Sequence, residues 1–406
     1  MTITNYLQKK KDQIFADLFA LISIPSVSSK SIHKEDIHSC ALKWQELLQK
    51  AGVDKAEVLS TRGNPVVYAN KIIDPALPVV LIYGHYDVMP AEPLELWHSE
   101  PFKPEIRDGK IFARGADDDK GQSFMHYVAF KYLIETGKLP CNVKFLIEGE
   151  EEIGSPNLEE FCRANKEMLR CDTILVSDTS MLAADLPSIT TGLRGLAYWQ
   201  IEVTAAARDL HSGIFGGAVA NPINELCKIL AQLSDENGRI TVPGFYDKVE
   251  DVSEEERKLI AQIPFDEQAY KDDLKIEETF GEKGYSTIER TGIRPAMDIC
   301  GIWGGYQGEG SKTVLPSKAF AKLSARLVPH QTYDEISKLV AEYILKIAPS
   351  HVKVEVHHLH GAESYVCPID SDAYRAAEVA YTKTFGKRPL PVRRGGSIGV
   401  VPVFEK

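Results

Sequence analysis

The stretch Ala113–Gly121, which reads ARGADDDKG, places three consecutive aspartates where a short strand, Gly109–Phe112, gives way to a segment of helical spacing, Gly121–Gly137. Three adjacent carboxylates repel one another unless a cation or a turn separates them. An acidic loop that caps a helix would satisfy the same pattern. The neighbouring segments must therefore be used to distinguish a metal site from a helix cap. In α/β folds the functional residues usually lie in loops where a strand is followed by a helix.

Three further apolar segments also run into histidine or carboxylate residues. Leu81–Val88 (LIYGHYDV) ends in His85 and Asp87, and Thr173–Asp178 (TILVSD) ends in a carboxylate. The third segment, Phe145–Ser155 (FLIEGEEEIGS), contains Glu148, Glu150, Glu151 and Glu152. Because the carboxyl ends of parallel strands meet at one edge of a sheet, these segments together predict a metal site at that edge.

Size and composition limit the class of protein. A chain of 406 residues exceeds one ordinary core, so we expect two domains. The net charge of −11 argues against a nucleic-acid or anionic-membrane partner, and no apolar run approaches the length of a membrane span. The N-terminal sequence MTITNYLQKKKDQIF lacks the features of a signal peptide. Seven cysteines with no C-x-x-C pair favour reduced thiols in a cytoplasmic protein.

The order of strand and helix patterns predicts an α/β fold. Residues 1–187 alternate between apolar strands and amphipathic helices, which predicts a mostly parallel sheet with helices on both faces. From residue 188 to 370 the pattern changes to alternating half-exposed strands and fewer helices, as in a small α+β domain. Residues 371–406 contain a helix and the turn Arg393–Ser397, which we expect to return the chain to the first domain.

Several motifs together resemble one family. They are GHYDV at 84–88, ARGADDDKG at 113–121, EGEEEIGS at 148–155, SD at 177–178, DLHSG at 209–213 and GGS at 395–397. In order and spacing they are similar to those of the co-catalytic zinc peptidases, the family of carnosinase, cytosolic non-specific dipeptidase, carboxypeptidase G, aminoacylase and acetylornithine deacetylase. The dipeptidase branch is the most similar. The resemblance implies a catalytic α/β domain with an inserted α+β lid that forms a homodimer.

The resemblance implies a ligand set for two zinc ions per subunit. His85 and Asp178 match the ligands of one zinc, Glu152 matches a ligand of the other, and Asp118 matches the carboxylate that bridges both. The peptide bond before Asp119 is expected to be cis. Ligand type alone also permits Mn²⁺ or Co²⁺.

The same resemblance implies catalytic roles. Asp87 would hold the other ring nitrogen of His85. Glu151 would act as general base on a hydroxide that bridges the two zinc ions, and His211 from the partner subunit would stabilise the oxyanion. Arg326 matches the residue that binds the substrate carboxylate, and Thr313, His360 and Ser397 match positions that contact substrate.

We therefore predict a cytoplasmic dipeptidase that acts on dipeptides or short peptides. An N-acyl-amino-acid deacylase of the same family, which uses the same metals and base, is the enzymatic alternative. The family's last zinc ligand is a histidine beyond the GGS turn, and no histidine follows His360 here. We expect that the chain is truncated and that, as written, Asp118 and Glu152 alone hold the second metal weakly, so that the chain binds one zinc or none and is inactive. A metal-poor scaffold that keeps the lid is the third interpretation.

Overall fold

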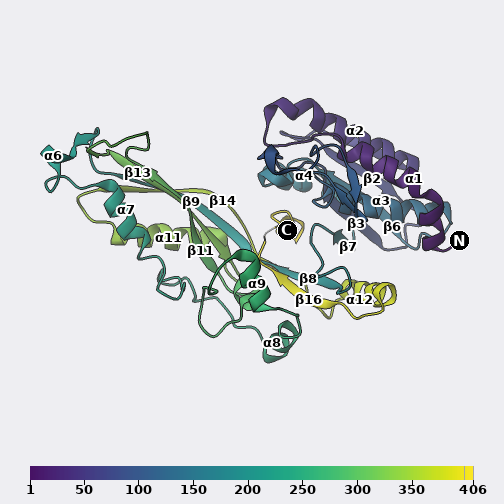
Figure 1. Ribbon diagram of the computed structural model, residues 1–406. Helices are drawn as coiled ribbons and strands as arrows, with labels where there is room; N and C mark the ends of the chain where they lie inside the picture. The colour runs from purple at the N-terminus through teal and green to yellow at the C-terminus, as the bar shows by residue number, and fades with distance from the viewer. Residues whose placement is uncertain (397, 406) are drawn as a thin grey trace. The chain divides into compact units, whose positions relative to one another are not determined.

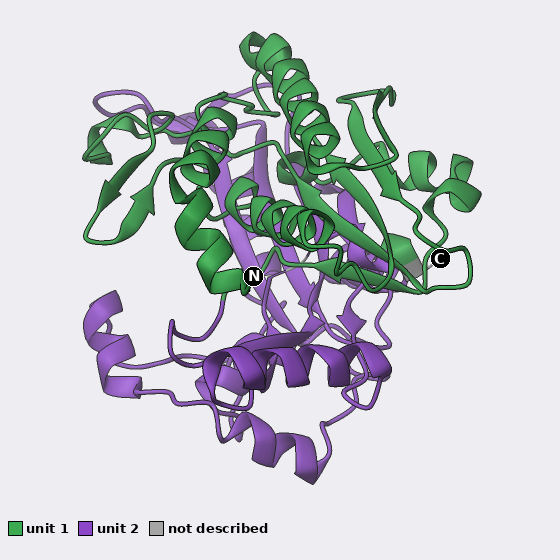
Figure 2. Ribbon diagram, turned by 90° about the vertical axis from the view of Figure 1, so that its right-hand side faces the viewer, with its two compact units in different colours: residues 1–180, 403–406 green, residues 181–402 purple. Residues whose placement is uncertain are grey.

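The computed structural model describes residues 1–396 and 398–405, and these form two compact units (Figure 2). The first unit comprises Met1–Ser180 with the residues from Val403 on, and the second comprises Met181–Pro402. The α/β class predicted from the sequence is confirmed. The predicted domain boundaries after residues 187 and 370 remain predictions. Within the described part of the chain, no helix is both long and apolar enough to cross a membrane.

The first unit is built on a five-stranded mixed sheet with the order β1-β2-β6-β3-β7. Its strands are β1 (Lys55–Leu59), β2 (Val66–Lys71), β3 (Val79–His85), β6 (Asn142–Glu148) and β7 (Thr173–Val176). β3 pairs in parallel with both β6 and β7, whereas β2 pairs antiparallel with β1 and β6. The parallel register places His85 opposite Glu148, so the predicted metal-binding segments end at one edge of the sheet.

Amphipathic helices cover this sheet (Figure 1). They are α1 (Ile3–Ile22), α2 (Lys34–Ala51), α3 (Lys120–Glu135), α4 (Leu158–Ala164) and α5 (Lys166–Leu169). In α2 the apolar residues recur every three or four positions, and Trp44 and Leu47 are fully buried among them. The helix ends at Gly52, whose φ of 93° requires the left-handed region. α2 packs on β1 and β2, and α3 packs on β3, which fixes the residues before Lys120 beside the end of that strand.

A hairpin precedes the aspartate run. β4 (Glu105–Arg107) and β5 (Lys110–Phe112) pair antiparallel across Asp108 and Gly109, which have φ values of 49° and 75°. Positive φ at both central residues is the requirement of a type I′ turn, and Asp-Gly is a preferred pair for it. The short strand predicted at Gly109–Phe112 is thus the second strand of this hairpin.

The second unit contains a four-stranded antiparallel sheet with the order β11-β13-β9-β14. The strands are β9 (Gly195–Thr204), β11 (Ala296–Gly304), β13 (Lys318–Leu327) and β14 (Lys353–Ala362). Every second residue of β9 and β13 is buried, and α7 (Pro222–Leu230) and α11 (Tyr333–Ile347) pack on that buried face. Just before the start of β13, β12 (Val314–Leu315) pairs with β10 (Leu210–His211), which leads into α6 (Ser212–Phe215; Figure 1).

A small sheet forms the other end of the second unit. β8 (Ser188–Leu193) pairs in parallel with β16 (Leu390–Arg394) and antiparallel with β15 (Tyr365–Val366). The remaining helices are α8 (Glu254–Ile260), α9 (Glu267–Leu274), α10 (Thr287–Gly292), α12 (Asp372–Phe385) and α13 (Val401–Glu405). Arg393 and Arg394, which the sequence predicts in a turn, are instead the last residues of β16. Ser397 lies outside the described residues.

Candidate metal centre

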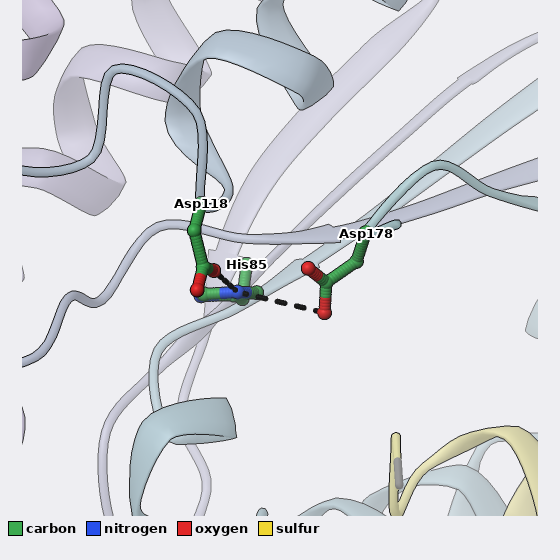
Figure 3. A group of neighbouring side chains, drawn as sticks. All are labelled: His85, Asp118 and Asp178. Carbon is green, nitrogen blue, oxygen red and sulfur yellow. Dashed lines mark hydrogen bonds and ion pairs between the residues drawn. The ribbon is translucent and has the colours of Figure 1, made fainter. Parts of the chain in front are cut away.

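His85, Asp118 and Asp178 converge at the carboxyl end of the parallel strands (Figure 3). One ligand atom of each lies within 4.8 Å of the others. His85 Nε2 is 3.0 Å from Asp118 Oδ1 and 3.8 Å from Asp178 Oδ2. His85 ends β3, Asp178 follows β7 and Asp118 precedes α3, so three separate segments contribute to the group.

The ring of His85 is held in one orientation. It is fully buried, and Nδ1 donates a hydrogen bond of 3.0 Å to the backbone carbonyl of Asp87. A carbonyl oxygen can only accept, so Nδ1 carries a proton and Nε2 is the nitrogen directed at Asp118 and Asp178. In the neutral ring Nε2 therefore presents its lone pair, which is the form that binds a metal.

The carboxylate of Asp87 connects His85 to the acidic loop that follows β6. Its Oδ1 is 3.4 Å from His85 Nδ1, and its two oxygens accept the backbone N–H groups of Glu151 and Glu152 at 3.2 and 3.1 Å. Because Asp87 is fully buried, these bonds fix the backbone of the loop. The sequence predicted only that Asp87 orients His85.

Asp119 links the aspartate run to β3 and α3 through hydrogen bonds. The Asp118–Asp119 peptide bond is cis, as the resemblance implied. Asp119 Oδ2 accepts hydrogen bonds from the backbone N–H of His85 at 3.0 Å and from Ser123 Oγ at 2.5 Å. Its other oxygen, Oδ1, is buried and has no hydrogen-bond partner among the described residues. Asp117, by contrast, is exposed to solvent.

Burial and the repulsion between neighbouring carboxylates raise the pKa values of most carboxyl groups at the site. Burial is the main reason why the pKa of Glu151 is raised to about 8 and the pKa values of Glu152 and Asp119 to about 7. Burial also raises the pKa of Asp178. These side chains lack the positive charge that would hold them ionised in a low-dielectric site.

His85 and Asp118 form a strongly attractive pair within the group. Burial disfavours the imidazolium, but hydrogen bonds to Asp118 and Asp87 outweigh it, so the pKa of His85 is raised well above its ordinary value. The hydrogen bond from His85 in turn lowers the pKa of Asp118. A single proton on the ring thus partly replaces the cation for which the donor set is suited.

Glu148 and Glu150 form hydrogen bonds with residues around the metal centre. Glu148 accepts hydrogen bonds from Tyr83 and Ser155 at 2.6 and 2.8 Å, and its burial raises its pKa to about 7. Glu150 accepts bonds from Asn64 and Asn157. These contacts indicate supporting roles for both residues.

The second unit carries the predicted lid residues in two separate places. His211 and Thr313 lie together at the β10–β12 pair, with 3.5 Å between His211 Nε2 and Thr313 Oγ1. Arg326 lies near the last residue of β13, and His360 on β14 stacks on Tyr198 with 5.1 Å between ring centroids. Arg326 and Tyr198 both occupy the half-exposed positions of their strands, so Arg326 and His360 share the sheet face opposite α7 and α11.

Two supporting residues were not identified from the sequence. Ser123 and His126 lie on α3, and His126 Nε2 is 2.6 Å from the Oγ of Ser177, the residue before Asp178. Burial lowers the pKa of His126 to about 4, so the ring is neutral. The helical position of Ser123, four residues after Asp119, is the sequence signal that could have identified it.

The donor set fits divalent metal ions. It combines one imidazole nitrogen of fixed tautomer with carboxylates, of which Asp178 and Glu152 are half-buried and have pKa values raised mainly by burial and further by neighbouring carboxylates. Mixed nitrogen and oxygen ligands of this kind suit Zn²⁺ and related ions.

Comparison with known proteins agrees with this geometry. Residues 81–400 match the sequence profile of peptidase family M20/M25/M40. The chain is 32% identical over 416 residues to a Cys-Gly metallodipeptidase of Schizosaccharomyces pombe, which covers 98% of this chain and 87% of that protein. It is 34% identical over 424 residues to human Beta-Ala-His dipeptidase, and the match covers 100% of this chain and 83% of that protein. The solved M20 family metallo-carboxypeptidase Sso-CP2 from Sulfolobus solfataricus has a TM-score of 0.86 at 33% identity, over 96% of this chain and 89% of that chain.

Proposed function

This chain belongs to peptidase family M20/M25/M40, and from that membership we propose that it is a metal-dependent dipeptidase that hydrolyses the amide bond of dipeptides or short peptides. The observation that carries the proposal is the convergence of His85, Asp118 and Asp178 within 4.8 Å at the ends of parallel strands. The names of the similar dipeptidases support the substrate class.

The proposed ligands divide between two zinc ions. His85 and Asp178 would hold one, Glu152 would contribute to the other, and Asp118 would be shared by both. When bound, such cations acidify a water molecule and polarise the amide carbonyl of the substrate. Mn²⁺ or Co²⁺ would satisfy the same donors.

Glu151 is the proposed general base. It would accept a proton from the attacking water and deliver it to the leaving amine. Its burial and its pKa of about 8 support this role, because a raised pKa makes the carboxylate a stronger base near neutral pH. The bond from its backbone N–H to Asp87 would keep it in place during both transfers.

His211 is the proposed oxyanion donor. Its Nδ1 accepts the backbone N–H of Gly213 at 3.0 Å, so in the neutral ring Nε2 carries the proton and is available to donate. The separation of lid residues supports a donor from a partner subunit. At about 3.4 Å per residue, Lys318 and Arg326 are about 27 Å apart along β13, whereas an extended dipeptide spans about 7 Å. One lid therefore does not bring Arg326 and His211 to the same substrate, and a homodimer would.

Arg326 is the proposed binding residue for the substrate carboxylate, because a guanidinium can form two parallel hydrogen bonds to it. Thr313, His360 and Ser397 are proposed to contact the substrate, and the protein is proposed to act in the cytoplasm.

The proposal is tested by adding Zn²⁺ to chelator-treated protein and measuring hydrolysis of Xaa-Xaa dipeptides beside N-acetyl amino acids. Metal-dependent cleavage of dipeptides would support it. Cleavage of the acyl substrates alone would indicate a deacylase, and neither metal uptake nor turnover would indicate a scaffold.

A further inference from the structure

We propose that Lys120 is a positioning residue of the metal centre, which holds the Asp118–Asp119 segment in register with the end of β3. The inference rests on the proposed function, since it concerns the same site. It starts from an unusual feature of Lys120, whose side chain is completely buried directly after the aspartate run.

The ammonium group of Lys120 is bound by backbone oxygens. Nζ donates to the carbonyl of Ile24 at 2.7 Å and to that of Leu21 at 3.2 Å. Among the described residues, no carboxylate oxygen lies within 4.0 Å of Nζ, the usual limit for an ion pair. Leu21 is in the last turn of α1, where the helix dipole favours a cation, and its carbonyl also accepts the backbone N–H of Ile24 at 3.3 Å.

Burial of an ammonium group without a paired carboxylate is unfavourable for stability. A methionine or leucine of similar volume would fill the same space without that penalty. The residue is therefore poorly explained as a core-filling side chain, and its two directional hydrogen bonds are what a hydrophobic substitute would lose.

The segment that Lys120 holds is also bonded to the end of β3. Ser26 Oγ donates to the carbonyl of Tyr86 at 2.6 Å, and the carbonyl of Ser26 accepts the N–H of Val88 at 3.0 Å. Tyr86 and Val88 flank Asp87, whose carboxylate holds the backbone of Glu151 and Glu152. Lys120 thus connects the Asp118 side of the centre, through residues 24–26, to the loop that carries the other ligand and the base.

Close packing around the stem of Lys120 leaves little freedom. Gly115 has a φ of 78°, and a Cβ there would lie 2.9 Å from Val88 Cγ1 and 3.4 Å from Lys120 Cδ. The turn that begins the aspartate run therefore rests directly on Lys120 and Val88. A shift of the lysine would move this turn and the ligand that follows it.

The test compares Lys120→Met with Lys144→Met. Lys144 is a matched control, because it is only 8% exposed and its Nζ donates to the carbonyl of Arg170 at 2.6 Å in the same unit. Zn²⁺ affinity is measured on metal-free protein by competition with a chromogenic chelator, and the melting temperature of each metal-free variant is recorded. We expect Lys120→Met to bind Zn²⁺ about 10–100-fold more weakly, as when a residue that orients metal ligands is removed. Lys144→Met should bind within about twofold of the unmodified chain.

Equal affinities for Lys120→Met and the unmodified chain would overturn the inference, as would an equal loss in both variants, which would mark a general effect of destabilisation. Should Lys120→Met not fold, hydrogen exchange of the unmodified chain gives the answer. Zn²⁺ binding should slow exchange of the N–H groups of Ile24, Ser26 and Val27 if they are coupled to the centre, and unchanged exchange there would refute the coupling. An unmodified chain that takes up no Zn²⁺ would overturn the proposed function and this inference with it.

Discussion

Gly84→Ala is the substitution whose effect can be worked most directly from the structure. Gly84 precedes His85 in β3, and a Cβ at this position would lie 1.9 Å from Ser123 Oγ, 2.7 Å from Asp119 Oδ2 and 3.0 Å from Ser123 Cβ. Rotation of the Ser123 hydroxyl would relieve the shortest contact but would break its bond to Asp119. The contact with Ser123 Cβ would remain, so α3 and β3 must also separate.

Two contributions determine how much Gly84→Ala lowers the free energy of unfolding. Overpacking of a close-packed site destabilises by about 1–3 kcal/mol, and loss of a hydrogen bond to a carboxylate by about 1.5–3 kcal/mol. Since the two changes relieve part of the same strain, we expect a total of about 2–4 kcal/mol. For a unit of this size that corresponds to a fall in melting temperature of roughly 5–15 °C. The displaced Asp119 also bonds the backbone N–H of His85, so Zn²⁺ affinity should fall at least about tenfold.

Calorimetry of the metal-free protein and chelator competition for Zn²⁺ would measure both effects. Gly301→Ala is the control, because Gly301 lies in β11, has no positive φ, and a Cβ added to it would have nothing within 4 Å. A Gly84→Ala protein with unchanged melting temperature and unchanged affinity would refute the argument that the contact of Gly84 with Ser123 and Asp119 organises the centre.

Three further predictions concern the proposed base, the proposed oxyanion donor and the dependence of stability on pH. Glu151→Gln should leave metal content unchanged and lower kcat by about 10²–10⁴, and retention of near-normal turnover would mean that another group is the base. His211→Ala should lower kcat by about 10²–10³ without a change in metal content or dimerisation, whereas a loss below tenfold would exclude it as oxyanion donor. The metal-free chain should lose stability from pH 5.5 to 8 in urea unfolding, because Glu148 and Glu151 keep their protons to about pH 7 and 8 when folded but release them near pH 4.5 when unfolded. Stability that rises over this interval would contradict the raised pKa values.

The central strands and their terminal residues could be predicted from the sequence. β3 is apolar along nearly its whole length, and β6 contains the apolar run Phe145–Ile147 directly before Glu148, which is the pattern of buried strands. His85, Asp118 and Asp178 could be predicted to meet because parallel strands bring their carboxyl ends together. The same reasoning gives no distances, and it does not separate the roles of adjacent residues such as Glu151 and Glu152.

Edge and connecting strands were missed for a physical reason. Lys55–Leu59 and Ser188–Leu193 are short, and Ala296–Gly304 lies at a sheet edge with mostly exposed side chains, so none of them has a strong period of two. The strand Leu390–Arg394 ends in two arginines and a glycine pair, which resembles a turn. It is a strand because β8 supplies a parallel partner some 200 residues earlier in the chain.

Contacts to backbone atoms also escape sequence analysis. Lys120 bonds the carbonyl oxygens of Leu21 and Ile24, and His85 bonds the carbonyl of Asp87. Every residue carries such an oxygen, so residue type gives no signal for the partner. Only the fold determines which carbonyl is within reach.

The first 180 residues contain every strand of the five-stranded sheet, together with His85, Asp118, Glu151, Glu152 and Asp178. During synthesis on the ribosome, these residues leave the exit tunnel before the lid has been translated. The sheet of the first unit can thus form and bind its first metal ion while the residues after 180 are still being added. Translation proceeds at about 5–20 residues per second. Nascent chains long enough for residue 180 to have left the exit tunnel would therefore be the earliest species in which ion capture is expected.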